Sequence, residues 1–302
     1  MVTFSTNVKN ELCKISRPLG ENSIKLLYGL LLFSRKFKIS DISFYTENKN
    51  INELVEELIV KEFGCIVDIT YSKAKKENIK LTVPDMNDRE KILNRFGHIK
   101  EDINLKINGD FLKTKNDIKL FLRGVFLSCG SINDPQNGYH LEFAVSYMNL
   151  SKSLLNLFLE IMDVKFKVKT TTRKGSFVVY MKDSADITDF LTYIGAQCSA
   201  MELMQVKMVK EVRNYVNRTT NFETANMGKI ATAAAIQIDS IRKIKKHGKF
   251  NCLDETLKEL ADLRIKNPEM SLRELGQNLS VPLTRSGVNH KMKKILSFGE
   301  NL

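Results

Sequence analysis

The sequence of 302 residues predicts an α+β protein in which a duplicated αββαββα region, residues 1–204, precedes an all-α domain. Three observations predict this fold class. An apolar helix, a strand, an amphipathic helix, a hairpin and a closing helix follow one another twice before residue 200. From about residue 205 the alternating strand pattern disappears and helical periodicity takes over. The C-terminal residues then show the capping and turn signals of a helix-turn-helix.

The first half of the duplicated region, about residues 20–98, begins with a strongly apolar helix. A strand follows, and then a helix whose apolar residues recur three and four positions apart. Its closing helix starts at Asp85, a favourable N-cap residue, and ends near Gly97. The expected elements are a helix over residues 21–37, a strand over 41–48, a helix over 51–64, a hairpin over 65–84 and a helix over 85–97.

The second half, about residues 115–196, repeats this order. Its closing helix again starts at an aspartate, Asp183, and again ends at a glycine, Gly195. The expected elements are a helix over residues 116–130, a strand over 140–147, a helix over 149–162, a hairpin over 165–182 and a helix over 183–195.

Two pairs of glycines lie at almost the same spacing in the two halves. Gly124 follows Gly29 by 95 positions, and Gly195 follows Gly97 by 98. Such even spacing favours a duplication, although an α/β chain without one can present its elements in a similar order. Because glycine lets two backbones approach closely, we expect the two apolar helices to pack against each other. The uncovered faces of the two sheets would then form one saddle.

The rest of the chain is expected to form a linker helix, residues 205–222, and a helix-turn-helix domain, residues 223–302. One apolar face lies within residues 231–241, in a helix that ends at Gly248. A shorter amphipathic helix ends before Pro268. The expected helices cover residues 201–218, 219–248 and 254–267.

The helix-turn-helix pattern lies in the last 32 residues. Ser271 and Glu274 have the spacing of a capping box, and Gly276 is placed where two helices need close contact. The sequence "SVPLT" supplies the turn, and the next helix begins at about Thr284. The positions of this helix that recur at core spacing are Val288, Met292 and Ile295.

The opposite face of this helix is basic and amide-rich, as is typical of a helix that reads DNA. Arginine and asparagine side chains can contact base edges, and lysines contact phosphates. A basic amphipathic helix on a solvated surface would show the same face, but the caps, the turn and the core stripe favour a helix-turn-helix. The expected DNA contacts are Ser271, Arg273, Thr284, Arg285, Ser286, Asn289, His290, Lys293 and Lys294.

The charge of the chain supports a polyanionic partner. The net charge is +12, and the residues from Lys207 onward carry 18 Lys/Arg against 10 Asp/Glu. The five cysteines are scattered without a CxxC pair, and the four histidines are dispersed, so the sequence predicts no metal, no cofactor and a reducing cytoplasm. It shows neither a signal peptide nor an apolar run of membrane length.

The two apolar helices resemble the paired motifs of LAGLIDADG homing endonucleases, "LYGLLLFSR" and "LRGVFLSCG" in this chain. The resemblance implies that the last position of each motif would bind the catalytic divalent metal. Those positions hold Ser34 and Cys129, and the earlier acidic positions hold Leu32 and Leu127. A hard cation such as magnesium prefers carboxylate oxygens, so we expect no cleavage activity.

The whole chain resembles the WhiA family of bacterial regulators linked to sporulation and cell division. The stretches that carry the resemblance are "FSTNVKNELCKI", "RGVFLSCGSINDPQNGYHLEF", "NRTTNFETANMGK" and "SGVNHKMKKI". The resemblance implies a non-catalytic, sequence-specific DNA-binding transcription regulator, cytoplasmic and nucleoid-associated. Its expected partners are double-stranded DNA and, as further candidates, RNA polymerase or another transcription factor.

Four basic residues outside the helix-turn-helix are further candidates for DNA contact. Arg35, Lys36 and Arg123 lie near the ends of the two motifs, and Arg218 lies in the linker helix. Two other functions are kept open. The chain could be a scaffold whose N-terminal domain binds a protein or ligand, with DNA contact secondary, or an endonuclease in which other acids replace those of the motifs.

Overall fold

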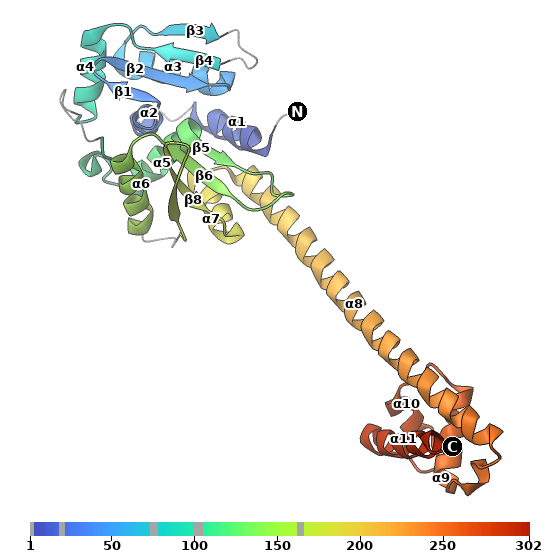
Figure 1. Ribbon diagram of the computed structural model, residues 1–302. Helices are drawn as coiled ribbons and strands as arrows, with labels where there is room; N and C mark the ends of the chain where they lie inside the picture. Colours follow the sequence, from blue (N-terminus) through green and yellow to red (C-terminus); the bar gives the residue numbers. More distant parts are fainter. Residues whose placement is uncertain (1–2, 18–21, 73–77, 99–104, 162–165) are drawn as a thin grey trace. The chain divides into compact units, whose positions relative to one another are not determined.

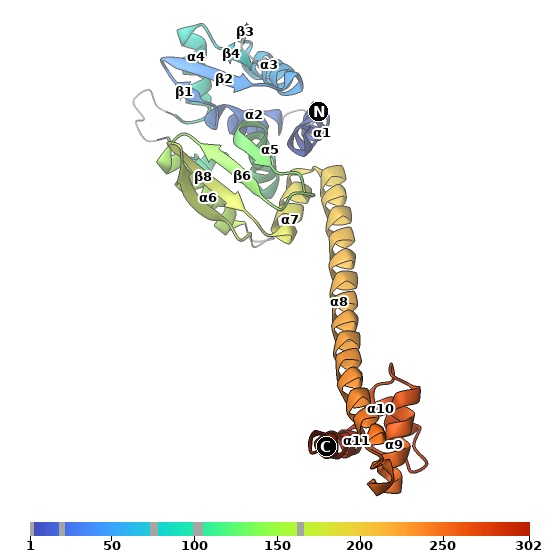
Figure 2. The same cartoon turned by 45° about the vertical axis from the view of Figure 1, so that its right-hand side comes forward.

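The computed structural model describes residues 3–17, 22–72, 78–98, 105–161 and 166–302, and it divides into two compact units, residues 1–210 and 211–302. Figures 1 and 2 show the elements of both units. One helix, α8 (Gln197–Lys246), belongs to both, since the boundary falls within it.

The first unit contains two halves with the same order of elements. The first half comprises α2 (Ser23–Leu32), β1 (Lys36–Lys38), β2 (Asp41–Thr46), α3 (Lys49–Phe63), β3 (Asp68–Ser72), β4 (Asn78–Thr82) and α4 (Met86–Arg95). The second half comprises α5 (Lys115–Cys129), β5 (Gly130–Ile132), β6 (Leu141–Val145), α6 (Met148–Glu160), β7 (Lys169–Arg173), β8 (Ser176–Met181) and α7 (Ser184–Ile194). The predicted duplicated αββαββα fold is confirmed.

Each half forms a four-stranded antiparallel sheet of the same topology, with strand orders β1-β2-β4-β3 and β5-β6-β8-β7. The strands alternate between buried and more exposed residues. Phe44 pairs with Leu81 on the buried face, and their neighbours Tyr45 and Lys80 pair on the open face. Because side chains alternate across a strand, one face of the first sheet packs on helices and the other stays open.

Helices α2 and α5 cross at the centre of the unit, between the two sheets (Figures 1 and 2). Helix α2 is apolar almost throughout, and α5 is buried from Leu120 to Leu127, where its only charged residue is Arg123. Gly29 and Gly124 lie at the crossing. A Cβ atom on Gly124 would lie 2.2 Å from the carbonyl oxygen of Leu26, so only glycine permits this approach.

The structure adds a helix that the sequence did not predict, α1 (Phe4–Ser16), capped by Thr3. Its buried residues join the core of the first unit. The carboxylate of Glu11 accepts hydrogen bonds from the backbone of Cys198 (2.8 Å) and Ser199 (3.0 Å). Both amides belong to the first turn of α8, where free N–H groups need acceptors, so α1 caps α8.

Two sequence-based expectations about elements differ from the structure. Residues 36–38, expected to continue the first apolar helix, form the short strand β1, because that helix ends at Leu32. Residues 201–218 and 219–248, expected as two helices, lie in the single helix α8, which continues to Lys246. The expected turn at residues 73–77 lies outside the described residues.

The second unit is all-α. Besides the end of α8 it contains η3 (Phe250–Cys252), α9 (Glu255–Lys266), α10 (Leu272–Gln277) and α11 (Arg285–Glu300). Its core gathers apolar residues of all four α-helices: Ile241, Ile244, Leu257, Leu260, Leu275, Val288, Met292 and Ile295. Among the described residues, no helix combines the length and apolar character needed to cross a bilayer.

Candidate nucleic-acid interface

Helices α10 and α11 form the expected helix-turn-helix. In the capping box of α10, the Glu274 carboxylate accepts from the Ser271 backbone N–H (2.7 Å) and the Ser271 hydroxyl accepts from the Glu274 N–H (3.3 Å). The turn closes where the Leu283 N–H donates to the Gly276 carbonyl (2.9 Å). A Cβ on Gly276 would lie 2.3 Å from the Leu283 oxygen, so glycine is required for this tight turn.

The core side of α11 is buried and its opposite side is exposed. Val288, Met292 and Ile295 are the predicted core positions, and each is at most 1% exposed. The Thr284 side chain caps the helix by accepting from the Gly287 N–H (3.3 Å). The exposed residues of the predicted DNA-contacting set are Arg273, Thr284, Arg285, Ser286, Asn289, His290, Lys293 and Lys294, and Ser271 is half-buried.

Contacts from α9 fix the position of both helices. The Glu259 carboxylate accepts from the backbone N–H and the hydroxyl of Ser280, each at 2.6 Å, and so holds the turn. The Lys291 ammonium donates to the Thr256 hydroxyl on the side of α11 that faces α9. A rigid scaffold of this kind holds the exposed face of α11 in one orientation.

The two positions that correspond to metal-binding acids in the endonuclease motifs lie at the ends of α2 and α5. Ser34 is buried, and its hydroxyl donates to the Lys36 carbonyl (3.2 Å). Burial raises the pKa of the Cys129 thiol to about 12, so the sulfur stays protonated and is a weak metal ligand. Within the described part of the chain, no group of three or more His, Cys, Asp or Glu residues could hold a metal ion.

Lys9 of α1 is the cation beside Cys129, and sequence reasoning did not identify it. Burial is the main cause that lowers the pKa of Lys9, and the nearby Glu47 carboxylate opposes this effect. Lys9 lines a hollow of about 460 Å³ together with Thr6, Asn48 and Ser128. The capped amphipathic pattern of residues 4–16 was the signal that could have placed this helix.

Arg35 and Lys36 are exposed on the open side of the first sheet. The Lys36 ammonium pairs with Asp41 at 2.8 Å, and the Arg35 guanidinium lies 5.7 Å from the Tyr45 ring centre. These residues line a hollow of about 540 Å³, to which the second half contributes Tyr147. Their charge is therefore partly balanced by an acid, as expected for a surface of modest net charge.

Arg123 is not on the surface, and its prediction as a DNA contact is wrong. Its side chain is 5% exposed, and its Nε donates to the carbonyl oxygen of Ile194 at 2.7 Å, at the end of α7. In a helix as apolar as α5, a single arginine can turn inward to satisfy a helix-terminal carbonyl. Arg218, by contrast, is exposed on α8.

Two family models match the chain: the WhiA LAGLIDADG-like domain over residues 118–213 and the WhiA C-terminal HTH domain over residues 216–298. The chain is 37% identical to the "Probable cell division protein WhiA" of Clostridium botulinum (strain Hall), over 100% of its own length and 99% of that protein's. It is also 37% identical to the protein of the same description from Thermoanaerobacter sp. (strain X514), over 100% and 98% of the two chains.

A solved structure shows the same fold over nearly the whole chain. The crystal structure of full-length WhiA from Thermotoga maritima matches with a TM-score of 0.62 and 26% identity, covering 99% of both chains. The matched models account separately for the duplicated region and for the helix-turn-helix. From the identity over its full length to curated relatives, the chain belongs to the WhiA family.

Proposed function

We propose that the protein is a sequence-specific DNA-binding transcription regulator of cell division or sporulation that acts on the chromosome. The observation that carries the proposal is the exposed basic and amide-rich face of α11, opposite a stripe of fully buried core residues. The second helix of a helix-turn-helix lies in the major groove of DNA. Helix α11 is that helix here, and its cap and the contacts from α9 hold it in place.

Different residues of this face supply affinity and specificity. Arg285 and Asn289 lie one turn apart near the N-terminal end of α11, where the guanidinium and the amide can make paired hydrogen bonds to base edges. Lys293 and Lys294 follow one turn later, and they contact backbone phosphates and release counterions. Ser271 and Arg273, at the start of α10, add phosphate contacts.

We further propose that the duplicated region has no nuclease activity. Its motif ends carry a hydroxyl and a protonated thiol where cleavage requires carboxylates to hold a metal. Its open sheet face, with Arg35 and Lys36, serves as a lower-affinity surface for DNA or for a protein such as RNA polymerase or another transcription factor. Supercoiled plasmid incubated with the protein and Mg²⁺ should stay intact; nicking that is lost in Cys129→Ala would overturn this part.

The DNA-binding proposal is tested by fluorescence anisotropy with the full-length protein. Genome-wide crosslinking first identifies a bound duplex, and a scrambled duplex serves for comparison. Arg285→Ala with Asn289→Ala should weaken binding to the selected duplex by about 1–3 kcal/mol per lost base contact, and binding to the scrambled duplex much less. Lys293→Ala should weaken both and lower the slope of log Kd against log salt by about 0.9.

The matched control is Lys246→Ala, which removes an exposed cation from the last turn of α8 and leaves the face of α11 unchanged. It should bind both duplexes like the parent protein. If the double variant keeps its circular dichroism spectrum and still binds the selected duplex with unchanged affinity, α11 is not the reading helix. If removing residues 217–302 leaves DNA affinity unchanged, the interface lies in the duplicated region instead.

A further inference from the structure

The second unit contains a pocket of about 570 Å³ between α8 and the N-terminal ends of α10 and α11. Phe222, Lys229 and Gln237 of α8 form one wall, and Arg264, Arg273 and Arg285 lie on the other. The volume is in the range of small-molecule sites. The lining combines the apolar residues Phe222, Ile230, Ala233 and Leu272 with a larger set of polar and basic residues.

The charge of the pocket is of one sign. Lys229, Arg264, Arg273 and Arg285 all line it, and none of its lining residues is an aspartate or glutamate. Four cations around one small volume repel one another in the empty state. An anion bound among them would replace this repulsion with attraction.

Arg264 is the most unusual of these cations, because its side chain is 2% exposed and no carboxylate is paired with it among the described residues. Its Nη1 donates only to the carbonyl oxygens of Met270 (2.7 Å) and Pro268 (3.3 Å), and its Nε has no hydrogen-bond partner. Burial lowers the pKa of this guanidinium, as expected when a charge loses water without gaining a counterion.

Gln237 lies on the opposite wall and is 6% exposed, and its Oε1 also has no partner among the described residues. Buried polar atoms nearly always have a hydrogen-bond partner, so two unpartnered atoms on opposite walls of one pocket favour a ligand between them. A bound group with an anionic end and a donor would compensate both residues.

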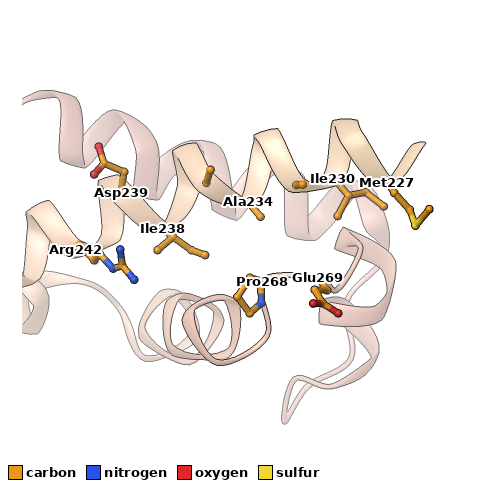
Figure 3. Close-up of a pocket in the computed structure, with 10 residues that line it drawn as sticks. Met227, Ile230, Ala234, Ile238, Asp239, Arg242, Pro268 and Glu269 are labelled. Carbon is orange, nitrogen blue, oxygen red and sulfur yellow. The ribbon is translucent and has the colours of Figure 1, made fainter. Parts of the chain in front are cut away.

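An apolar groove adjoins this pocket and shares Ile230 with it. Figure 3 shows Met227, Ile230, Ala234 and Ile238 along one side of α8, opposite Pro268. The groove has a volume of about 700 Å³. It therefore offers room for the apolar part of a molecule whose charged end lies among the cations.

We propose that this pocket binds a small anionic ligand that also carries an aromatic or other apolar group, and that the ligand competes with DNA. The first part rests on the lining of the pocket alone. The second part rests on the proposed function, because Arg273 and Arg285 line the pocket and also belong to the expected DNA-contacting face. The chain thus has a route by which a metabolite controls DNA binding without reaching the duplicated region.

The probe for the test is 8-anilino-1-naphthalenesulfonate, which joins a sulfonate to aromatic rings and fluoresces when it leaves water. The chain has no tryptophan, so the probe signal is free of energy transfer from that residue. N-phenyl-1-naphthylamine, which lacks the sulfonate, is the matched neutral probe. Full-length protein should bind the anionic probe more tightly than the neutral one, and inorganic pyrophosphate should displace the anionic probe.

Three single variants locate the binding site. Lys229→Gln and Phe222→Ala change exposed side chains of the pocket. Each should lower the affinity for the anionic probe by about threefold to tenfold, the first because a charge is lost and the second because an aromatic ring is lost. Lys246→Gln removes a cation of α8 outside the pocket and should leave probe binding unchanged. Unchanged binding in both pocket variants would overturn the proposal.

DNA binding separates this proposal from the proposed function. In the parent protein the anionic probe should weaken DNA binding, and in Lys229→Gln this effect should require several times more probe. Lys229→Gln should bind DNA normally without probe; a loss there would mean that the pocket is a DNA phosphate contact and would overturn the ligand proposal. If neither the parent protein nor any variant binds DNA, the proposed function fails. The probe titrations still decide whether the pocket binds anions.

Discussion

Gly29 and Gly124 face each other where α2 crosses α5, and a side chain on either glycine would collide with the backbone of the facing helix. A Cβ on Gly29 would lie 2.2 Å from the Phe121 carbonyl oxygen, and one on Gly124 would lie 3.1 Å from the Cα of Gly29. Because the colliding atoms belong to backbones, no side chain can move aside to make room. The close crossing of the two helices therefore requires glycine at both positions.

Gly124→Ala should destabilise the first unit by at least about 2 kcal/mol, because the helices must separate to accept the methyl group. Gly109→Ala is the matched control, since a Cβ there meets no atom within 4 Å. Urea unfolding followed by circular dichroism measures both. A Gly124→Ala protein as stable as the control would show that the crossing is looser than described.

Arg123→Ala should lower the melting temperature and leave DNA affinity unchanged. The substitution removes the Nε donor of the Ile194 carbonyl, and losing such a buried hydrogen bond costs about 1–3 kcal/mol. Arg35→Ala, which changes an exposed arginine, should leave the melting temperature unchanged. Calorimetry and anisotropy on the same samples separate the two effects; weaker DNA binding by folded Arg123→Ala would reinstate this residue as a contact.

The two hydrogen bonds from Ser280 to the Glu259 carboxylate should make the stability of the protein vary with pH in the acidic range. The hydroxyl and then the backbone N–H of Ser280 hold the pKa of Glu259 below its ordinary value of 4.5. A depressed carboxyl pKa stabilises the fold above the unfolded value, and the contribution is lost as the pH falls through the folded value. Glu259→Gln should therefore melt lower than the parent at pH 7, with the difference shrinking toward pH 3.

The control for this pH effect is Glu269→Gln, which changes an exposed carboxylate in the loop before α10. Its melting temperature should follow that of the parent at every pH. A difference between parent and Glu259→Gln that is the same at pH 7 and pH 3 would rule out the charge of Glu259 as the source of the effect.

The five cysteines should differ in reactivity. Burial raises the pKa of Cys13 and of Cys129 to about 12, and thiols alkylate as thiolates. Cys198 and Cys252 are exposed. Brief iodoacetamide treatment at pH 8, followed by peptide mass spectrometry, should modify Cys198 and Cys252 and spare Cys13 and Cys129. Denatured protein, in which all five should react, is the control; rapid labelling of Cys129 in folded protein would contradict its raised pKa.

The order of the elements was predictable from the sequence because each half repeats its hydrophobic periodicity and closes with an Asp cap and a terminal glycine. Gly29 and Gly124 were expected at the helix contact, and they lie there. The three-residue strands β1 and β5 were not located, since so short a strand has no period of its own. The break expected near residue 218 in α8 is absent because no proline or capping glycine interrupts the helix there.

The candidate site was predictable where buried apolar residues and exposed basic residues occupy opposite faces of one helix. The core stripe and the exposed face of α11 follow directly from a period of 3.6 residues. Arg123 was misplaced because its neighbours in α5, from Leu120 to Leu127, are apolar on every side of the helix, so periodicity did not show which way the arginine side chain points. The cationic pocket could not be predicted, since Arg264 and Gln237 meet there only through the packing of α8 on later helices.

The attachment of α1 has a consequence for the order in which the chain folds during synthesis. Ser199, the partner of Glu11, is synthesised 188 positions after it. Ser5, which accepts from the Ile132 N–H (3.4 Å), also waits for the second half. Helix α1 therefore cannot complete these contacts until the start of α8 has been made, and until then its apolar face is the surface that chaperones would meet.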